Sequence, residues 1–172
     1  MNVLVTYASK HGSTADIARV IADELGMAGF SVGLEPADSV DSIESYDAVI
    51  LGSAIYVGQW QQAALNLIER EQDALKQRDV WLFTSGPIGE DPFPKDEPPA
   101  TIELLAKTGA HEHQGFTGKL DRTKLGFGER LIASVVRAPE GDFRDWEAIR
   151  AWAISIGRIL AEIGARTTPA TR

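Results

Sequence analysis

A loop near the N-terminus combines hydroxyl side chains with a glycine, and this combination suits the binding of a phosphate group. Its residues are Ser9, Lys10, His11, Gly12, Ser13 and Thr14. The loop leads into a predicted helix, whose first backbone N–H groups lack partners within the helix and whose dipole attracts negative charge. The sequence therefore predicts a phosphate site here, with a simple hydroxyl cap on the helix as the alternative.

Motifs of several other chemistries are missing. The chain contains neither the P-loop pattern GxxxxGK[ST] nor the dinucleotide pattern GxGxxG. It also offers no Ser-His-Asp arrangement and no carboxylate dyad, which leaves Tyr56 and His11 as the candidate general acids. This pattern favours electron or hydride transfer over hydrolysis.

Two further loops could contact a flat ring and its polar edge. The first contains Ala54, Ile55, Tyr56, Val57, Gly58 and Trp60. Its aromatic side chains could lie against a planar ligand, or Trp60 could begin a helix and pack in the core. The second comprises Thr84, Ser85, Gly86, Pro87, Ile88 and Gly89. Its glycines let backbone amides approach carbonyl and ring-nitrogen atoms of a ligand, with a plain turn as the alternative.

The elements that must position these loops alternate along the chain. Apolar runs predict strands over Asn2–Tyr7, Phe30–Leu34, Asp47–Gly52, Val80–Ser85 and His111–Phe116. Amphipathic patterns predict helices over Thr14–Ala28, Trp60–Gln77 and Pro99–Lys107, and a last helix that Asp142 caps, with an apolar stripe from Trp146 to Ile163. The alternation predicts an α/β fold with a parallel sheet, helices on both faces and ligands outside the carboxyl ends of the strands.

Size and composition narrow the classes of protein further. The 172 residues fit one domain, predicted over residues 1–164 with a tail over 165–172. A net charge of -8 argues against nucleic acid as a partner. The lack of cysteine excludes thiolate catalysis, and three histidines are too few for a metal site, so His111 and His113 are predicted to be ordinary surface residues. No signal peptide or membrane-spanning stretch is recognisable, which predicts a cytoplasmic location.

The segment 119–141 interrupts the alternation before the last helix. Its portion 119–137 carries five basic and two acidic residues, although the chain as a whole is acidic. We expect either a packing helix with a solvated basic side or a docking surface. Such a surface would suit an anionic substrate, a redox partner protein or a peripheral contact with a membrane.

The stretch TYASKHGST, residues 6–14, resembles the phosphate loop of the flavodoxin family, with Ala8 in place of one hydroxyl residue. The resemblance implies a doubly wound five-stranded parallel sheet with strand order 2-1-3-4-5 and FMN as the cofactor. It also implies that the loop from Ser9 to Thr14 binds the FMN phosphate, while Ala54–Trp60 and Thr84–Gly89 flank the isoalloxazine ring. A receiver-type signalling domain shares this topology, but it needs acidic residues where Thr6, Tyr7 and Gly52 stand.

A narrower resemblance concerns the segments GSAIYVGQW, residues 52–60, and GDFRDWEAIRAWA, residues 141–153. Both are similar to the branch of flavodoxin domains that includes the menaquinone-dependent protoporphyrinogen dehydrogenases, which also carries an insert before its last helix. The expected function is FMN-based electron transfer with a redox partner protein. The alternatives are an FMN-dependent dehydrogenase or quinone reductase acting on a small quinone or porphyrinogen-like substrate, and an FMN-free interaction module.

Overall fold

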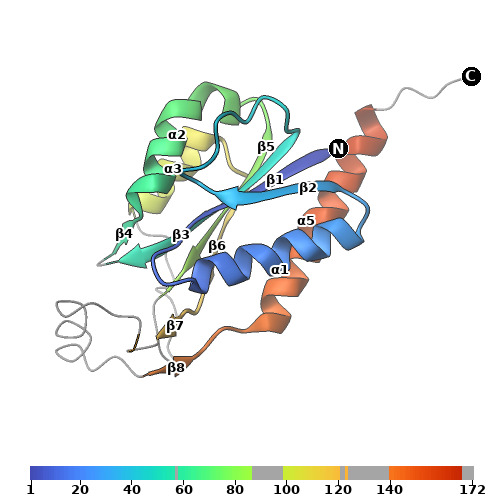
Figure 1. Cartoon of the computed structure of the whole chain (residues 1–172). Coiled ribbons are helices and arrows are strands. Elements are labelled where there is room, and N and C mark those ends of the chain that lie inside the picture. The colour runs from blue at the N-terminus through green and yellow to red at the C-terminus, as the bar shows by residue number, and fades with distance from the viewer. Residues whose placement is uncertain (57, 87–98, 121–122, 124–139, 168–172) are drawn as a thin grey trace, which may run out of the picture.

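A parallel β-sheet forms the centre of the protein, as a computed structural model shows for residues 1–56, 58–86, 99–120, 123 and 140–167 (Figure 1). Its parallel strands are β1 (Asn2–Ala8), β2 (Ser31–Pro36), β3 (Ala48–Tyr56), β5 (Asp79–Ser85) and β6 (His113–Phe116). They are arranged in the order β2-β1-β3-β5-β6. Counted along the chain without the short β4, this is the predicted order 2-1-3-4-5, so the fold prediction is confirmed.

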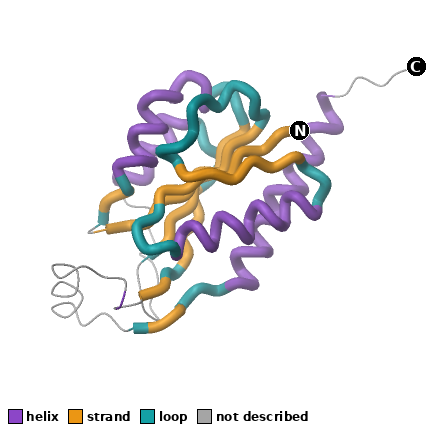
Figure 2. Tube along the Cα trace, in the orientation of Figure 1, coloured by secondary structure: helices purple, strands orange, loops and turns teal. Residues whose placement is uncertain are grey.

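Helices cover both faces of the sheet (Figure 2). On one face, α1 (Ser13–Met27) and α5 (Trp146–Thr167) pack on the apolar side chains of β1 that include Val3 and Val5. On the other face, α2 (Gln62–Leu75) and α3 (Pro99–Thr108) pack in a second cluster that contains Leu4. This division follows from the alternation of side chains along a strand, because successive residues of β1 point to opposite faces.

The centre of the sheet is packed too tightly for a side chain at Gly52. A Cβ atom on this residue would lie 2.0 Å from Cζ of Phe83, which is fully buried on the adjacent strand β5. Because residue 52 has no side chain, the Phe83 ring can lie across the neighbouring strand β3. The same ring contacts Trp152 of α5 edge to face.

Two short antiparallel pairs were not predicted. Strand β4 (Gln59–Trp60) folds back on the end of β3, and β7 (Lys119–Leu120) pairs with β8 (Gly141–Asp142). The second pair brings together the two ends of the segment 119–141, whose predicted helical portion lies outside the described residues.

Several predicted boundaries were wrong. The helix predicted from Trp60 begins at Gln62, and the last helix continues to Thr167, beyond the point at which a tail was predicted. Asp142 does not cap α5, because its carboxylate binds Arg144 instead. The cap is Asp145, whose Oδ1 accepts a hydrogen bond from the backbone N–H of Ala148 at 2.9 Å.

Among the described residues, no helix is long and apolar enough to cross a membrane. The same part of the chain contains no group of three or more histidine or acidic side chains that could hold a metal ion.

Candidate functional site

The beginnings of the three predicted loops meet at one edge of the sheet. In the parallel register, Ala8 of β1 lies opposite Ser53 of β3, and Ser53 lies opposite Thr84 of β5. The first and third loops therefore begin almost level with each other at the carboxyl ends of β1 and β5 (Figure 1). Strand β3 continues further, to Tyr56, so Ala54, Ile55 and Tyr56 belong to the strand and not, as was predicted, to a loop. Val57, Pro87, Ile88 and Gly89 were predicted to belong to the site and lie outside the described residues.

The first loop turns sharply into α1. Gly12 adopts a left-handed conformation with φ of 91°, and its backbone N–H donates to Oγ of Ser9 at 3.1 Å. Gly12 is also the N-cap residue of α1, and no side chain caps the helix. The alternative explanation of the loop, a hydroxyl that merely caps the helix, is therefore not what the structure shows.

The hydroxyl of Thr14 has no hydrogen-bond partner within the described part of the chain, although it is fully buried. A buried hydroxyl without a partner is unfavourable, because it has lost its hydrogen bonds to water and gained none in return. Thr14 lies in the first turn of α1, beside the backbone N–H groups that a helix start leaves available. This combination provides donors for an anionic group that the protein itself does not contain.

Ser13 connects the loop to two other segments. Its Oγ lies 3.2 Å from Oγ of Ser85, at the end of β5, and accepts a hydrogen bond from the backbone N–H of Lys119, also at 3.2 Å. Gly86, the residue after Ser85, has φ of 114° and donates its backbone N–H to the carbonyl of Phe116 at 3.0 Å. The third loop therefore begins directly beside the first.

Tyr56, at the end of β3, is contacted by two residues of the first loop, Lys10 and His11. Nε2 of His11 lies 2.9 Å from the Tyr56 hydroxyl, and Nζ of Lys10 lies 4.7 Å from the centre of its ring. The ring remains half-buried. An aromatic face with a cation and an imidazole beside it is thus placed next to the candidate phosphate site.

Trp60 lies deeper than Tyr56. Its side chain is only 6% exposed and packs in the cluster beneath α2, with its ring centre 6.3 Å from that of His113. Trp60 therefore packs in the core, which was the alternative considered for it. Its contact with the ring of a bound cofactor stays a prediction. The prediction that His113 is an ordinary surface residue was wrong, because His113 is half-buried and its Nε2 lies 2.9 Å from Oγ1 of Thr84.

Sequence reasoning missed Arg144, which lies between β8 and α5. Its side chain is 5% exposed and binds the carboxylates of Asp142 and Asp16. These hydrogen bonds raise the pKa of Arg144 above its ordinary value, and its guanidinium holds the pKa of Asp142 below the usual range. The available signal was an aspartate two residues before an arginine, a spacing at which the two side chains can form an ion pair.

Comparisons with known proteins agree with this architecture. Residues 4–146 match the family model described as Flavodoxin domain. A stretch of 97 residues, 56% of this chain, is 29% identical to an uncharacterized protein of Methanocaldococcus jannaschii, and the match spans 63% of that protein.

Solved structures of low sequence identity share the fold. A flavodoxin from the domain Archaea is 14% identical, with a TM-score of 0.61 over 94% of this chain and 99% of that one. Oxidised flavodoxin 2 of Bacillus cereus is 22% identical, with a TM-score of 0.64 over 92% of this chain and 99% of its own. The rubredoxin oxygen:oxidoreductase of Desulfovibrio gigas is 18% identical, with a TM-score of 0.64 over 94% of this chain and 36% of that one. With most of its length matched by the family model, this chain belongs to the flavodoxin domain family.

Proposed function

We propose that the protein binds FMN at the carboxyl edge of β1, β3 and β5 and transfers electrons through it. The observation that carries the proposal is the buried hydroxyl of Thr14, which has no partner among the described residues and lies at a helix start capped by no side chain. A phosphate dianion would accept hydrogen bonds from this hydroxyl and from the first N–H groups of α1.

The loop residues divide the work of holding such a cofactor. Ser9, Ser13 and Thr14 would hold the phosphate, while Lys10 and His11 reach across to Tyr56. The Tyr56 ring and the backbone of the third loop, beginning at Ser85, would hold the isoalloxazine ring and keep water from it. The same role is predicted for Val57, Pro87, Ile88 and Gly89, which lie outside the described residues. FMN, when bound, supplies the electron chemistry, because its ring takes up and releases one or two electrons.

Titration of the purified protein with FMN tests the proposal. We expect saturable quenching of flavin fluorescence, and about tenfold or greater weakening when Ser13→Ala is combined with Thr14→Ala, because hydrogen bonds to a charged phosphate are lost. Ser155→Ala is the control, since the Ser155 hydroxyl bonds the Trp152 carbonyl within α5. A protein that never quenches FMN would instead be an FMN-free interaction module.

A second candidate function is an FMN-dependent dehydrogenase or quinone reductase of the protoporphyrinogen dehydrogenase type. The segments 52–60 and 141–153 favour it by their resemblance to that branch. In addition, β7 and β8 set both ends of the insert beside the candidate phosphate loop, where a substrate-binding insert would be useful. Anaerobic turnover with a quinone and with a porphyrinogen distinguishes this enzyme from an electron carrier, which would reduce only a protein partner.

The basic segment 119–137 is the proposed docking region for the redox partner, the anionic substrate or a membrane surface. Most of it lies outside the described residues, so the proposal rests on its charge. We expect the rate of electron transfer to the partner to fall as salt screens this charge. A rate independent of salt would argue against docking through this segment.

A further inference from the structure

Arg144 is a buried cation that joins the C-terminal part of the chain to the start of α1. Its Nε and Nη2 donate to the two carboxylate oxygens of Asp142 at 2.7 and 2.5 Å, and its Nη1 lies 3.0 Å from Oδ2 of Asp16. The guanidinium also lies over the ring of Trp146, 4.3 Å from its centre. A planar guanidinium suits these simultaneous contacts, which a lysine could not reproduce.

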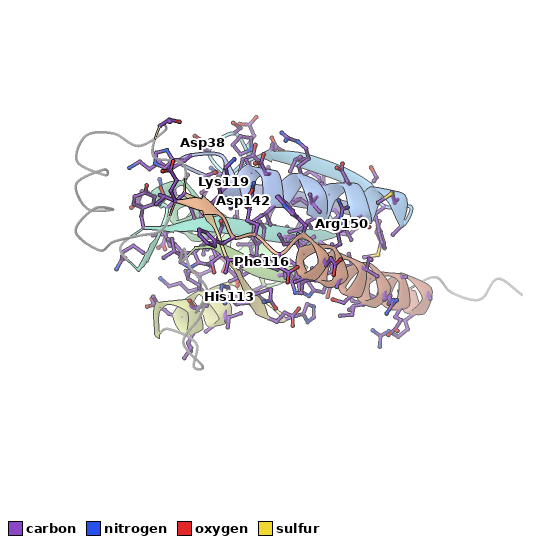
Figure 3. The ribbon with its side chains drawn as sticks, turned by 90° about the horizontal axis from the view of Figure 1, so that it is seen from below. Asp38, His113, Phe116, Lys119, Asp142 and Arg150 are labelled. Carbon is purple, nitrogen blue, oxygen red and sulfur yellow. The ribbon has the colours of Figure 1, made fainter. Side chains whose placement is uncertain are left out.

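The same contacts lead directly to the candidate phosphate loop. Nη1 of Arg144 approaches the carbonyl oxygen of Ser13 at 3.5 Å, one turn before Asp16. The Ser13 hydroxyl in turn accepts a hydrogen bond from the backbone N–H of Lys119, which lies opposite Asp142 in the antiparallel pair of β7 and β8. Figure 3 shows Lys119 and Asp142 close to each other near the start of α1. Ser13 is therefore held by the backbone of β7 and by Arg144, two residues beyond β8.

The direction of these hydrogen bonds matters for an anion. Because Lys119 donates its N–H to Ser13 Oγ, the Ser13 hydroxyl acts as an acceptor there. Its own proton stays available for Ser85 or for a phosphate oxygen. An arrangement fixed in this way before binding avoids the entropy loss that would otherwise weaken the complex.

We propose that Arg144 is a positioning residue for the phosphate loop: by fixing the first turn of α1 against the paired strands β7 and β8, it determines how tightly the phosphate end of the cofactor is held. This inference rests on the proposed binding of FMN. Arg144 itself is surrounded by carboxylates and a carbonyl, so it acts through Ser13 and Asp16 and not by contact with the phosphate.

The chain offers a matched control in an ion pair between α5 and α1. Nη1 of Arg150 lies 2.6 Å from Oε1 of Glu24, but the Arg150 side chain is 51% exposed. Glu24 is also three turns along α1 from Ser13, and Figure 3 shows Arg150 farther along α5, away from Lys119 and Asp142. Removing this pair takes away an α1–α5 contact without touching the loop.

The experiment compares FMN with riboflavin, which has the same ring and no phosphate. Dissociation constants for both are measured by flavin fluorescence with the wild type, Arg144→Met, Arg144→Lys and Arg150→Met. We expect Arg144→Met to weaken FMN binding about tenfold and riboflavin binding by less than about twofold. The FMN dissociation constant of Arg144→Lys should lie between those of the wild type and Arg144→Met, because lysine restores a charge without the bidentate contact. Arg150→Met should change neither dissociation constant.

Hydrogen exchange of the ligand-free protein provides a second measurement. The backbone amides of residues 9–16 should exchange faster in Arg144→Met than in the wild type, and at the wild-type rate in Arg150→Met. If Arg144→Met does not fold, Asp16→Asn removes the negative charge of one partner and keeps the Arg144–Asp142 pair, and it should likewise weaken FMN binding more than riboflavin binding.

The outcomes separate the two proposals. The role of Arg144 alone is overturned if the wild type binds FMN and Arg144→Met binds FMN with the same affinity. It is also overturned if Arg144→Met loses as much affinity for riboflavin as for FMN. A wild type that binds no FMN overturns the proposed function, and the positioning role with it.

Discussion

The hydroxyl of Tyr56 lies 2.9 Å from Nε2 of His11, so a hydrogen bond joins the second predicted loop, whose Tyr56 is the last residue of β3, to the loop after β1. These loops were predicted to hold different parts of a ligand, and the bond connects the two parts. It directly links the predicted phosphate end of the site to its predicted ring end.

The first prediction measures this link. In a double-mutant cycle of His11→Ala and Tyr56→Phe, we expect the two losses of FMN binding energy to be non-additive by about 0.5–1.5 kcal/mol, the net value of one hydrogen bond. FMN titration of the four proteins gives the coupling. Tyr46→Phe, beside β2 at the opposite end of the sheet, should leave FMN affinity unchanged. Strictly additive losses would mean that the bond does not contribute to the site.

The second prediction concerns the buried Thr14 hydroxyl. Thr14→Val should leave the free energy of unfolding of the ligand-free protein unchanged or slightly higher, because a buried hydroxyl without a partner is removed. The same change should weaken FMN binding about tenfold. Chemical denaturation and FMN titration measure the two effects.

Thr108→Val is the matched control, because the buried Thr108 hydroxyl donates to the carbonyl of Leu104 at 2.8 Å. It should lower the free energy of unfolding by about 1 kcal/mol or more and leave FMN affinity as it is. A Thr14→Val protein that is destabilised and still binds FMN normally would remove Thr14 from the site.

The third prediction tests the close packing of β3 and β5. Gly52→Ala should lower the free energy of unfolding by about 1–3 kcal/mol, because its Cβ would lie 2.0 Å from the Phe83 ring. Gly26→Ala, in α1 with no atom within 4 Å of the new Cβ, should instead raise it by about 0.5–1 kcal/mol. Urea denaturation of both variants checks the opposite signs. Two variants of equal stability would contradict this account of the core.

The fourth prediction is a pH dependence that arises from Asp142. Its pKa is held below the ordinary 3.8, chiefly by hydrogen bonds from Arg144, so the folded state favours the ionised carboxylate. The stabilisation is therefore complete above pH 3.8 and is lost as the pH falls through the lower folded-state pKa. Asp142→Asn should lower stability at neutral pH and flatten the acid limb of the stability curve. An acid limb of wild-type steepness in this variant would show that Asp142 does not contribute.

The regular elements were predictable because their sequence patterns are long. Strands β1, β3 and β5 are apolar runs buried on both faces, and α1 repeats apolar residues at helical spacing from Ile17 to Leu25. The alternation of these strands and helices along the chain was enough to predict a parallel sheet. The hydroxyl-rich loop was found because Ser9–Thr14 extend from the end of β1 into the first turn of α1.

The connections between loops were not predictable, because they join residues distant in sequence. Asp142 and Asp145 both precede α5 and both could cap it, and only the position of Arg144 decides that Asp145 does. The two-residue strands β4, β7 and β8 are too short to carry a period. Trp60 is similar, because its burial depends on how β4 folds back on β3.

The three contacts of Ser13 have a consequence for the order of events during folding. Its partners Ser85, Lys119 and Arg144 are separated from it by 72, 106 and 131 positions in the chain. Contacts of such long range close large loops and form late. A chain still emerging from the ribosome thus carries its hydroxyl-rich turn from the beginning but completes the surroundings of that turn only when the last third has been synthesised. Capture of a cofactor would then report that synthesis has reached α5.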